Sequence, residues 1–333
     1  MQVPIVALGI EYSLKCTNRC GHCAVEAGPE RKEKLTPEDI IPRVAEFHAR
    51  GIREIVFAGG EPVLFIDELE EISKEIKIRG WKQTIFTNSY WADTLKNARL
   101  FSLRFKKMQV DQMVISTSQY HREFTRAENI LNAVRGLKEE GIEVGVMLMV
   151  KPDNGGNDHI LMELRRLNVS SSLYRLYPQG RGGALKEKVF CYHLTWPQVI
   201  RSRCGLLHQM FISSAGDVLR CCTITSFLNA LGTKEFYHYG NIREDNMTRI
   251  FDNVSRYNRV FQVMRHCGVG EIYEHLREKL EKAGFIPDRL YSSPCEFCSS
   301  LFGNKRYLKI VTEHFAEINN DGFRPSGGRS INL

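Results

Sequence analysis

The sequence predicts an α/β protein: a partial (β/α)6 barrel of the TIM type, followed by a smaller C-terminal domain. Apolar runs of strand length alternate with helix-like segments about six times in roughly the first 180 of 333 residues, which is typical of parallel strands joined by crossover helices. The polar and glycine-rich motifs follow the strand ends where TIM-type barrels carry their sites, which favours a barrel over a Rossmann sheet. Seven of the ten cysteines lie beyond residue 185, where this alternation has faded.

Cap and turn signals bound the predicted elements. Thr36 and Pro37 start the first helix as N-cap and first helical residue, and Gly51 ends it. Gly80 and Gly141 end two later helices in the same way. In chain order, we expect strands at 5–14, 55–58, 84–87, 113–116, 142–150 and 172–177, and helices at 36–51, 66–80, 92–105, 130–141 and 158–167.

The stretch from Gly180 to Gly183 is the best candidate for a linker. We therefore expect a barrel domain over 1–185, a cysteine-rich domain over 186–312 and a polar tail over 313–333. The tail ends in residues rich in Gly, Ser and Asn, a composition typical of poorly ordered termini.

Composition excludes several classes of protein. No run approaches the roughly 18 apolar residues of a membrane span, and the N-terminus lacks a signal-peptide pattern, so we expect a cytoplasmic protein. Ten cysteines in such a chain indicate metal or redox groups before disulfides. The net charge of +7 is spread among interleaved acidic residues, and there is no nucleic-acid-binding motif. A mildly basic surface suits an acidic peptide or an acidic electron donor.

The first cysteine group is Cys16, Cys20 and Cys23, spaced C-x₃-C-x₂-C directly after the first predicted strand. Three thiolates on one loop can hold three irons of a cubane and leave the fourth iron open to a small molecule. A zinc loop is the alternative, because C-x₂₋₄-C spacings also occur there. Zinc needs a fourth ligand, and His22 inside the loop is poorly placed to serve, so the spacing favours iron–sulfur.

A second motif, Gly59-Gly60-Glu61-Pro62, follows the second predicted strand. Together with the cysteine loop it resembles the radical S-adenosylmethionine (radical SAM) superfamily over about residues 5–180. The resemblance implies that Cys16, Cys20 and Cys23 hold a [4Fe–4S] cluster, and that the Gly59–Pro62 turn receives the amino group of SAM. It also implies SAM contacts at later strand ends, although polar strand ends or helix caps would explain these residues equally well: Asn88, Ser116, Ser118, His121 and Met147.

A second cysteine group lies in the C-terminal half, as a C-x₁₁-G-x₄-C pattern and a distant C-x₂-C. A tight turn at Gly216 would bring the two parts together. This pattern resembles the auxiliary iron–sulfur domain of the SPASM/twitch type. The resemblance implies a second [4Fe–4S] cluster, although four thiolates also suit zinc; the ligands would be Cys204, Cys221, Cys295 and Cys298.

Cys222 remains beside Cys221 as a spare thiol, whereas Cys191 and Cys267 are expected to be structural. The Cys-Cys pair, the 295–302 stretch and the Thr-Asn-Ser-Tyr-Trp run at 87–91 resemble radical SAM peptide epimerases that act on valine and isoleucine. The resemblance implies that a 5′-deoxyadenosyl radical removes an α-hydrogen from an L-residue of a ribosomally made peptide. The Cys222 thiol then returns a hydrogen atom to the opposite face, which gives a D-residue.

Two other functions stay open. A radical SAM enzyme with the same two clusters could crosslink a peptide through a thioether or carbon–carbon bond, or act as an aminocyclitol dehydrogenase or epimerase. A non-catalytic iron–sulfur or zinc protein is the third possibility, but it leaves Gly59–Pro62 without a role. The epimerase interpretation implies SAM, two [4Fe–4S] clusters, a precursor peptide and a flavodoxin- or ferredoxin-type electron donor. Because the first strand begins within ten residues of the start, we expect the barrel or C-terminal region to recognise the peptide.

Overall fold

The computed structural model describes residues 4–149, 158–174, 176, 179–185, 194–221, 231–288 and 290–317. These residues form two compact units. One contains Val6–Cys191 together with Phe211–Gly216, and the other contains Met1–Ile5, Tyr192–Met210 and Asp217–Leu333.

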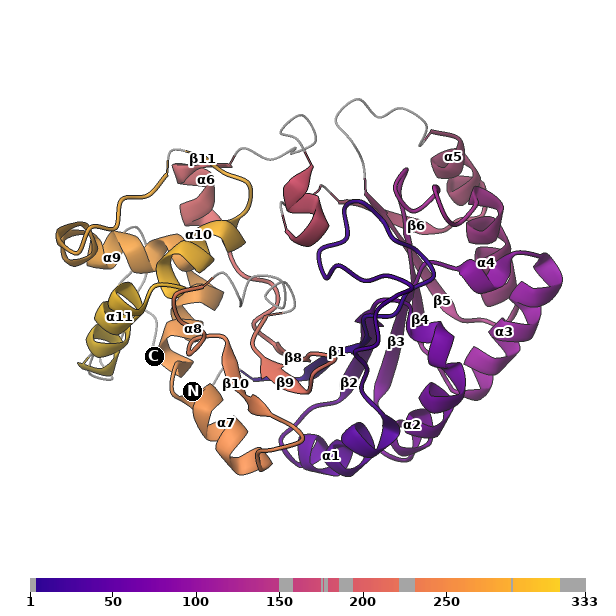
Figure 1. The fold of residues 1–333 in the computed structure, drawn as a ribbon, viewed down its shortest axis with the longest axis horizontal. Helices are drawn as coiled ribbons and strands as arrows, with labels where there is room; N and C mark the ends of the chain where they lie inside the picture. The colour runs from indigo at the N-terminus through magenta and orange to yellow at the C-terminus, as the bar shows by residue number, and fades with distance from the viewer. Residues whose placement is uncertain are drawn as a thin grey trace. The chain divides into compact units, whose positions relative to one another are not determined.

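The first unit is built on six parallel strands that pair in chain order, so the first and the last of them are not paired with each other. Helices α1 to α5 lie along the outer side of this curved sheet (Figure 1). This arrangement confirms the predicted open (β/α)6 barrel. The strands are β1 (Ala7–Ser13), β2 (Glu54–Gly59), β3 (Lys82–Thr87), β4 (Gln112–Thr117), β5 (Glu143–Met149) and β6 (Ser170–Tyr174).

The crossover helices follow the predicted signals closely. Thr36 is the N-cap of α1 and Pro37 its first residue, and the apolar stripe of Ile40, Val44 and Phe47 is buried. The other helices are α2 (Ile66–Ile78), α3 (Leu95–Lys107), α4 (Ala127–Glu139) and α5 (Asp158–Arg166), with α1 spanning Pro37–Ala49.

Several predicted boundaries shifted; helix α4, for example, begins at Ala127 and not at residue 130. The helix expected from residue 92 begins at Leu95, because Thr94 caps it and residues Tyr90–Ala92 form the short 3₁₀ helix η2. The strand expected at 172–177 lies at Ser170–Tyr174, where its pairing with β5 places Ser170 opposite Gly145.

The predicted linker is wrong. Gly180–Ala184 forms the 3₁₀ helix η3, and its Arg181 is bound to the cysteine loop. The Arg181 guanidinium donates hydrogen bonds to the carbonyl oxygens of Cys20 at 2.9 Å and Ala27 at 2.6 Å. A flexible connection would not make such contacts, so this glycine-rich stretch is part of the barrel unit.

The second unit is mainly helical in its described part. Its core stacks Phe236 on Phe302 with ring centroids 4.1 Å apart, and Phe261 packs beside them. Its strands are β7 (Leu194–Thr195), which pairs with β11 (Leu290–Tyr291), and β9 (Asp217–Leu219), which pairs with β10 (His238–Asn241), while β8 (Gln209–Ile212) spans the boundary of the two units. Its helices are α6 (Trp196–Arg201), α7 (Met247–Ser255), α8 (Asn258–His266), α9 (Val269–Lys282), α10 (Pro294–Phe302) and α11 (Lys305–Glu317).

The polar tail does not begin at residue 313, as predicted. Helix α11 continues to Glu317 and buries Phe315, because the apolar stripe of this helix extends past the polar residues that suggested an end. The remainder of the expected tail lies outside the described residues.

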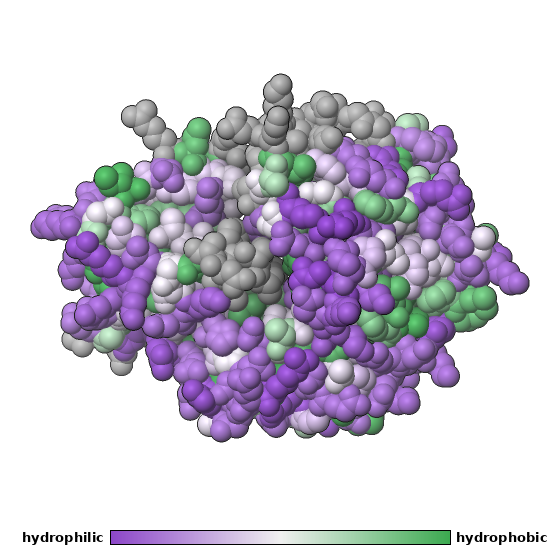
Figure 2. Space-filling view, in the orientation of Figure 1, coloured by the Kyte–Doolittle hydropathy of each residue, from purple (hydrophilic) through white to green (hydrophobic). Residues whose placement is uncertain are grey.

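The surface is mostly polar. Hydrophilic residues dominate the face in Figure 2, and apolar residues are scattered over it in small groups. Exposed charges often pair across neighbouring helices, as Arg99 does with Glu139 and Arg104 with Glu70. Among the described residues no helix has the length and apolar character that crossing a bilayer requires.

The backbone at the end of β2 lies directly against the backbone at the start of the cysteine loop. Gly60 N–H donates to Ser13 O at 2.6 Å and Glu61 N–H donates to Lys15 O at 2.9 Å. A Cβ on Gly59 would lie 2.5 Å from Ser13 O, and a Cβ on Gly60 would overlap the Lys15 carbonyl. Only residues without a side chain fit here, so the sequence Gly-Gly fixes where the loop leaves the sheet.

We expect Gly60→Ala to lower the free energy of unfolding by about 2 kcal/mol, because the added methyl group must displace the Lys15 backbone. Chemical denaturation of the purified apoprotein measures this. Gly145→Ala in β5 is the matched control, since a Cβ there meets nothing closer than Gln112 Nε2 at 4.0 Å. Equal stability of the two variants would contradict the close approach.

Candidate functional site

The cysteine loop between β1 and α1 is held by its own backbone. Cys16 N–H donates to Gly28 O at 3.1 Å, Gly28 N–H donates to Leu14 O at 3.0 Å, and Leu35 N–H donates to Tyr12 O at 2.8 Å. These bonds close the loop at its base, so the three cysteines are carried on a fixed frame.

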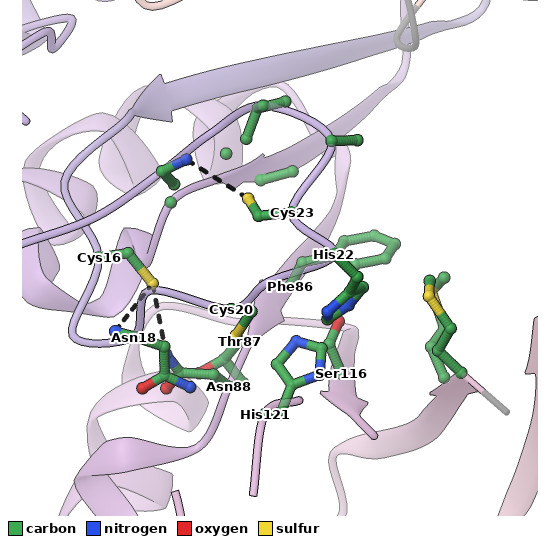
Figure 3. A pocket seen from close by; sticks show the side chains of 18 of the residues that line it. Cys16, Asn18, Cys20, His22, Cys23, Phe86, Thr87, Asn88, Ser116 and His121 are labelled. Atoms are coloured by element: carbon green, nitrogen blue, oxygen red, sulfur yellow. Dashed lines mark hydrogen bonds between the residues drawn. The ribbon is translucent and has the colours of Figure 1, made fainter. Parts of the chain in front are cut away.

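The three cysteines line one cavity of about 250 Å³ at the C-terminal end of the strands (Figure 3). None of the cysteines in the described part of the chain forms a disulfide. The cavity therefore combines free thiols with strand-end side chains, as the sequence predicted for an open barrel. Other lining residues are Asn18, His22, Ala58, Gly59, Gly60, Phe86, Thr87, Asn88, Ser116, Thr117, His121, Met147, Met149, Tyr174 and Arg181.

The electrostatic state of the thiols indicates a site for a cationic group. The pKa of Cys16 and of Cys20 is raised to about 12, mainly by burial and in part by the neighbouring cysteines. The Glu61 carboxylate also raises the pKa of Cys16. Three clustered thiolates are stable here only when a metal centre offsets their charge, so the donor set fits a thiolate-bound metal group.

Two imidazoles lie beside the thiols. The His22 ring stacks on Tyr120 with centroids 4.8 Å apart and meets the edge of His121 at the same separation. Burial, the largest cause, lowers the pKa of His22 to about 4 and of His121 to about 3, so both rings are neutral near pH 7. Ligand atoms of Cys20, His22 and His121 lie within 4.8 Å of one another. Geometry alone therefore keeps the zinc alternative open.

Glu61 is completely buried and its side chain turns away from the cavity into the protein. Oε1 accepts hydrogen bonds from Val63 N–H at 3.2 Å and Thr87 Oγ1–H at 2.9 Å, and Oε2 accepts one from Asn88 N–H at 2.7 Å. Burial raises the pKa of this carboxyl to about 7, against the lowering effect of its three donors. The carboxylate thus joins the end of β2 to the end of β3.

Most of the residues predicted to contact SAM line the cavity: Gly59, Gly60, Asn88, Ser116, His121 and Met147. Glu61, Pro62 and Ser118 are buried next to it and are not among the lining residues. The Ser118 hydroxyl instead contacts His121 Nδ1 at 2.9 Å and so orients that ring. The role of each of these residues in SAM binding stays a prediction.

Sequence reasoning missed three residues of this site. Asn18 lies inside the cysteine loop, where its side chain lowers the pKa of Cys20. Tyr174 and Arg181 reach the cavity from β6 and η3. The position of Asn18 between two cysteines was an available signal, whereas nothing in the local sequence marked Tyr174 or Arg181.

The structure also brings together the second cysteine group, within the second unit. Cys298 is partly exposed; burial is the main cause that raises its pKa, and the charges of the other three cysteines add to the rise. Gly216 has φ of +91° and donates to Ser213 O at 2.8 Å, which confirms the predicted tight turn. The group consists of Cys204, Cys221, Cys295 and Cys298.

Two polar side chains accompany this second group. The Tyr237 hydroxyl lies 3.6 Å from Cys298 Sγ and donates to the Cys298 carbonyl at 3.0 Å. The Arg220 guanidinium is buried over the Phe261 ring, 4.3 Å from its centroid, and Arg220 also donates to the Leu207 carbonyl. The thiolate charges of Cys204 and Cys221 favour its charged form, although burial lowers its pKa.

The spare cysteines have different outcomes. Cys222, predicted as the hydrogen-atom donor, and Cys191 lie outside the described residues. Cys267 is partly exposed, and burial raises the pKa of its thiol.

Comparison with known proteins identifies both regions. Residues 10–164 match the Radical SAM superfamily, and residues 204–277 match the SPASM iron–sulfur cluster-binding domain. The protein is therefore a radical SAM enzyme with a SPASM domain. A radical SAM domain binds a [4Fe–4S] cluster and SAM, and a SPASM domain binds additional iron–sulfur, which resolves the choice between iron and zinc left open by the geometry.

Several individual proteins are similar to this chain. YydG of Bacillus subtilis, which carries the provisional name of a peptide biosynthesis protein, is 22% identical over 322 residues, covering 95% of this chain and 98% of YydG. The GTP 3′,8-cyclase of Aquifex aeolicus is 28% identical over 49% of this chain. The match covers 52% of that enzyme, so it spans about half of each protein. The crystal structure of SuiB from Streptococcus suis bound to S-adenosylmethionine superposes with a TM-score of 0.41 at 17% identity, covering 74% of this chain and 65% of SuiB.

We expect wild type to lose stability relative to Glu61→Gln as the pH rises from about 5 to about 8. The change in the difference between their unfolding free energies is roughly 3 kcal/mol at most. The Glu61 pKa rises from 4.5 to about 7 on folding, so the folded state holds this proton more tightly. That contribution is present at low pH and is lost as the pH passes 7. At low pH the variant is less stable by about 1–3 kcal/mol, because an amide NH₂ must face a backbone or hydroxyl donor.

Denaturation of apoprotein at several pH values measures this difference. Glu143→Gln, at an exposed carboxylate that accepts a single side-chain hydrogen bond from Gln112, is the control. If the stability difference between wild type and Glu61→Gln did not change with pH, this would contradict the raised pKa of Glu61.

Proposed function

We propose that this radical SAM enzyme is a peptide epimerase, which converts L-residues of a ribosomally synthesised peptide into D-residues. The observation that carries the proposal is the similarity to YydG along almost the whole of both chains, including the C-terminal half. Similarity to the GTP cyclase covers only about half of each chain. The name of YydG supports a peptide substrate, and the Cys221-Cys222 pair supports epimerisation.

We assign the first cluster to Cys16, Cys20 and Cys23 and the auxiliary cluster to Cys204, Cys221, Cys295 and Cys298. The three thiols of the first group line one cavity with the Gly59–Gly60 backbone, which supports SAM binding beside them. We propose a barrel domain over residues 1–185 and an auxiliary domain that begins at residue 186. The end of the auxiliary domain moves from the predicted residue 312 to residue 317, where helix α11 ends.

Cys16, Cys20 and Cys23 would hold the first cluster, which with SAM bound would supply a 5′-deoxyadenosyl radical able to take the α-hydrogen of the target residue. The protein's part is to hold the peptide so that one face of the α-carbon meets this radical and the other meets the Cys222 thiol. Breaking the Cys222 S–H bond and forming a new Cα–H bond inverts the centre. The Cys222 thiyl would return to the thiol by taking one electron, which the proposed electron donor would supply, and one proton from solvent. Cys204, Cys221, Cys295 and Cys298 would hold the auxiliary cluster, which would supply electron-transfer chemistry.

The remaining partners belong to the same proposal. A flavodoxin- or ferredoxin-type protein would supply electrons, and the net charge of +7 supports an acidic donor of this kind. The precursor peptide is the proposed macromolecular substrate, and the cytoplasm is the proposed location.

The ligand assignment predicts iron contents. We expect Cys16→Ala to lose about four irons per chain and to lose SAM cleavage, because a three-thiolate site cannot keep its cluster with two ligands. Cys298→Ala should lose a similar amount of iron from the other unit. Cys267→Ala, a partly exposed cysteine outside both groups, is the control and should keep wild-type iron. Iron analysis and EPR of anaerobically reconstituted protein measure this, and full iron in Cys16→Ala would contradict the assignment.

The epimerase proposal predicts incorporation of solvent hydrogen. We expect wild type, supplied with SAM, reductant and the short peptide encoded beside its gene in D₂O, to add one deuterium at a single α-carbon. The added deuterium comes from the exchangeable Cys222 thiol. Cys222→Ala should form 5′-deoxyadenosine and fail to invert the residue. Mass spectrometry and chiral amino-acid analysis provide the two measurements.

The same experiment separates the alternatives. A product two hydrogens lighter would favour the crosslinking or dehydrogenase function over epimerisation. D-residues formed by Cys222→Ala would contradict the donor assignment alone. A chain that makes no 5′-deoxyadenosine although both clusters are loaded would contradict the proposal as a whole.

A further inference from the structure

Asn88 makes an unusual contact for a strand-end asparagine. Its side-chain amide Nδ2 lies 3.6 Å from Cys16 Sγ and donates to Thr17 Oγ1 at 2.9 Å (Figure 3). Asn88 follows β3, so this contact reaches the cysteine loop from a different part of the sheet. We propose that Asn88 donates an N–H···S hydrogen bond to the cluster-binding Cys16 and thereby raises the reduction potential of the first cluster. The inference rests on the proposed ligand role of Cys16.

The orientation of the amide is determined by its other contacts. Asn88 Oδ1 accepts a hydrogen bond from Tyr90 N–H at 3.0 Å. Turning the amide over would place its NH₂ group against this N–H and would place an oxygen against Cys16 Sγ. Since an amide nitrogen carries two hydrogens, one is available for Thr17 and one for the sulfur. The donor therefore faces the thiolate.

The surrounding structure is organised to hold Asn88 in place. Glu61 Oε2 accepts from the Asn88 backbone N–H at 2.7 Å, and this carboxylate is completely buried. Ser89 has φ of +60°, a left-handed conformation that is costly for a residue with a side chain. The strained turn lets the Asn88 side chain point at the loop while the chain continues into η2. Such strain persists where the environment enforces it, as the Glu61 bonds do here.

The other hydrogen-bond donors to the cysteine sulfurs come mostly from the cysteine loop itself. Cys16 Sγ also accepts from Asn18 N–H at 3.4 Å, and Cys23 Sγ accepts from Ala27 N–H at 3.4 Å. Both belong to the loop itself and form whenever the loop folds. Hydrogen bonds to cluster sulfurs stabilise the more negatively charged, reduced state and so set the potential. Asn88 adds one such bond that depends on the sheet, and a single substitution of Asn88 can remove it.

The test is an EPR-monitored redox titration of reconstituted enzyme without SAM. It compares wild type with Asn88→Ala and Asn88→Asp; the Asp variant keeps the side-chain volume and the oxygen that Tyr90 N–H needs. The signal of the first cluster is the one missing from Cys16→Ala. Asn129→Ala and Asn129→Asp are matched controls, because Asn129 is buried and donates to the carbonyls of Ser89 and Tyr90 on the same turn.

We expect both Asn88 variants to keep the iron content of wild type and to have a more negative potential at the first cluster. Both Asn129 variants should have the same potential as wild type. An Asn88→Ala potential equal to wild type, or an equal shift in Asn129→Ala, would overturn the inference. So would weaker SAM binding with an unchanged potential, which would make Asn88 a SAM contact alone. Should Asn88→Ala lose its cluster, Asn88→Asp decides by the same criterion. A signal that persists in Cys16→Ala would instead refute the ligand assignment on which the inference rests.

Discussion

The close approach of Gly59 and Gly60 to the backbone of residues 13–15 is the constraint on which the site depends. Side chains at these two positions would collide with main-chain atoms that cannot move without shifting β1 or the cysteine loop. The start of the loop is therefore placed by backbone hydrogen bonds, which have little freedom, and the side chains of Arg181 and Asn88 add further bonds to the loop. The next residue, Glu61, extends the constraint by binding the end of β3. Three consecutive residues thus set the cysteines, the cavity wall and Asn88 in one frame.

The folded site includes unfavourable contributions to the free energy that a bound cluster can reduce. The thiols of Cys16 and Cys20 have raised pKa values because burial opposes their ionisation. Ser89 adds backbone strain of about 1–2 kcal/mol. Each of these costs is concentrated within the site, while the helices and strands around it follow ordinary caps and apolar stripes. A group that binds thiolates recovers part of this cost, so cluster loading and folding of the loop are coupled.

The sequence was sufficient for the barrel because its signals are local. Thr36 and Pro37 set a helix start, and apolar runs set the strands, so the order of elements and most boundaries follow. The failures depend on contacts between distant residues. Arg181 makes a predicted linker part of the site through bonds to a loop about 160 residues earlier, and Asn88 meets Cys16 72 residues away. Local sequence carries no record of which strand ends become neighbours, so these contacts required the three-dimensional structure.

The two cysteine groups differ in the charges that surround them. Each has a guanidinium beside it: Arg181 lies at the first group and favours the thiolate form of Cys20, and Arg220 lies at the second with the Tyr237 hydroxyl. The two cations differ in burial, since Arg220 is 4% exposed and Arg181 is partly exposed, and a more buried cation interacts more strongly with a neighbouring thiolate. The second group therefore has the more buried cation, so the electrostatic difference between the two groups lies in the burial of the cation and not in its presence.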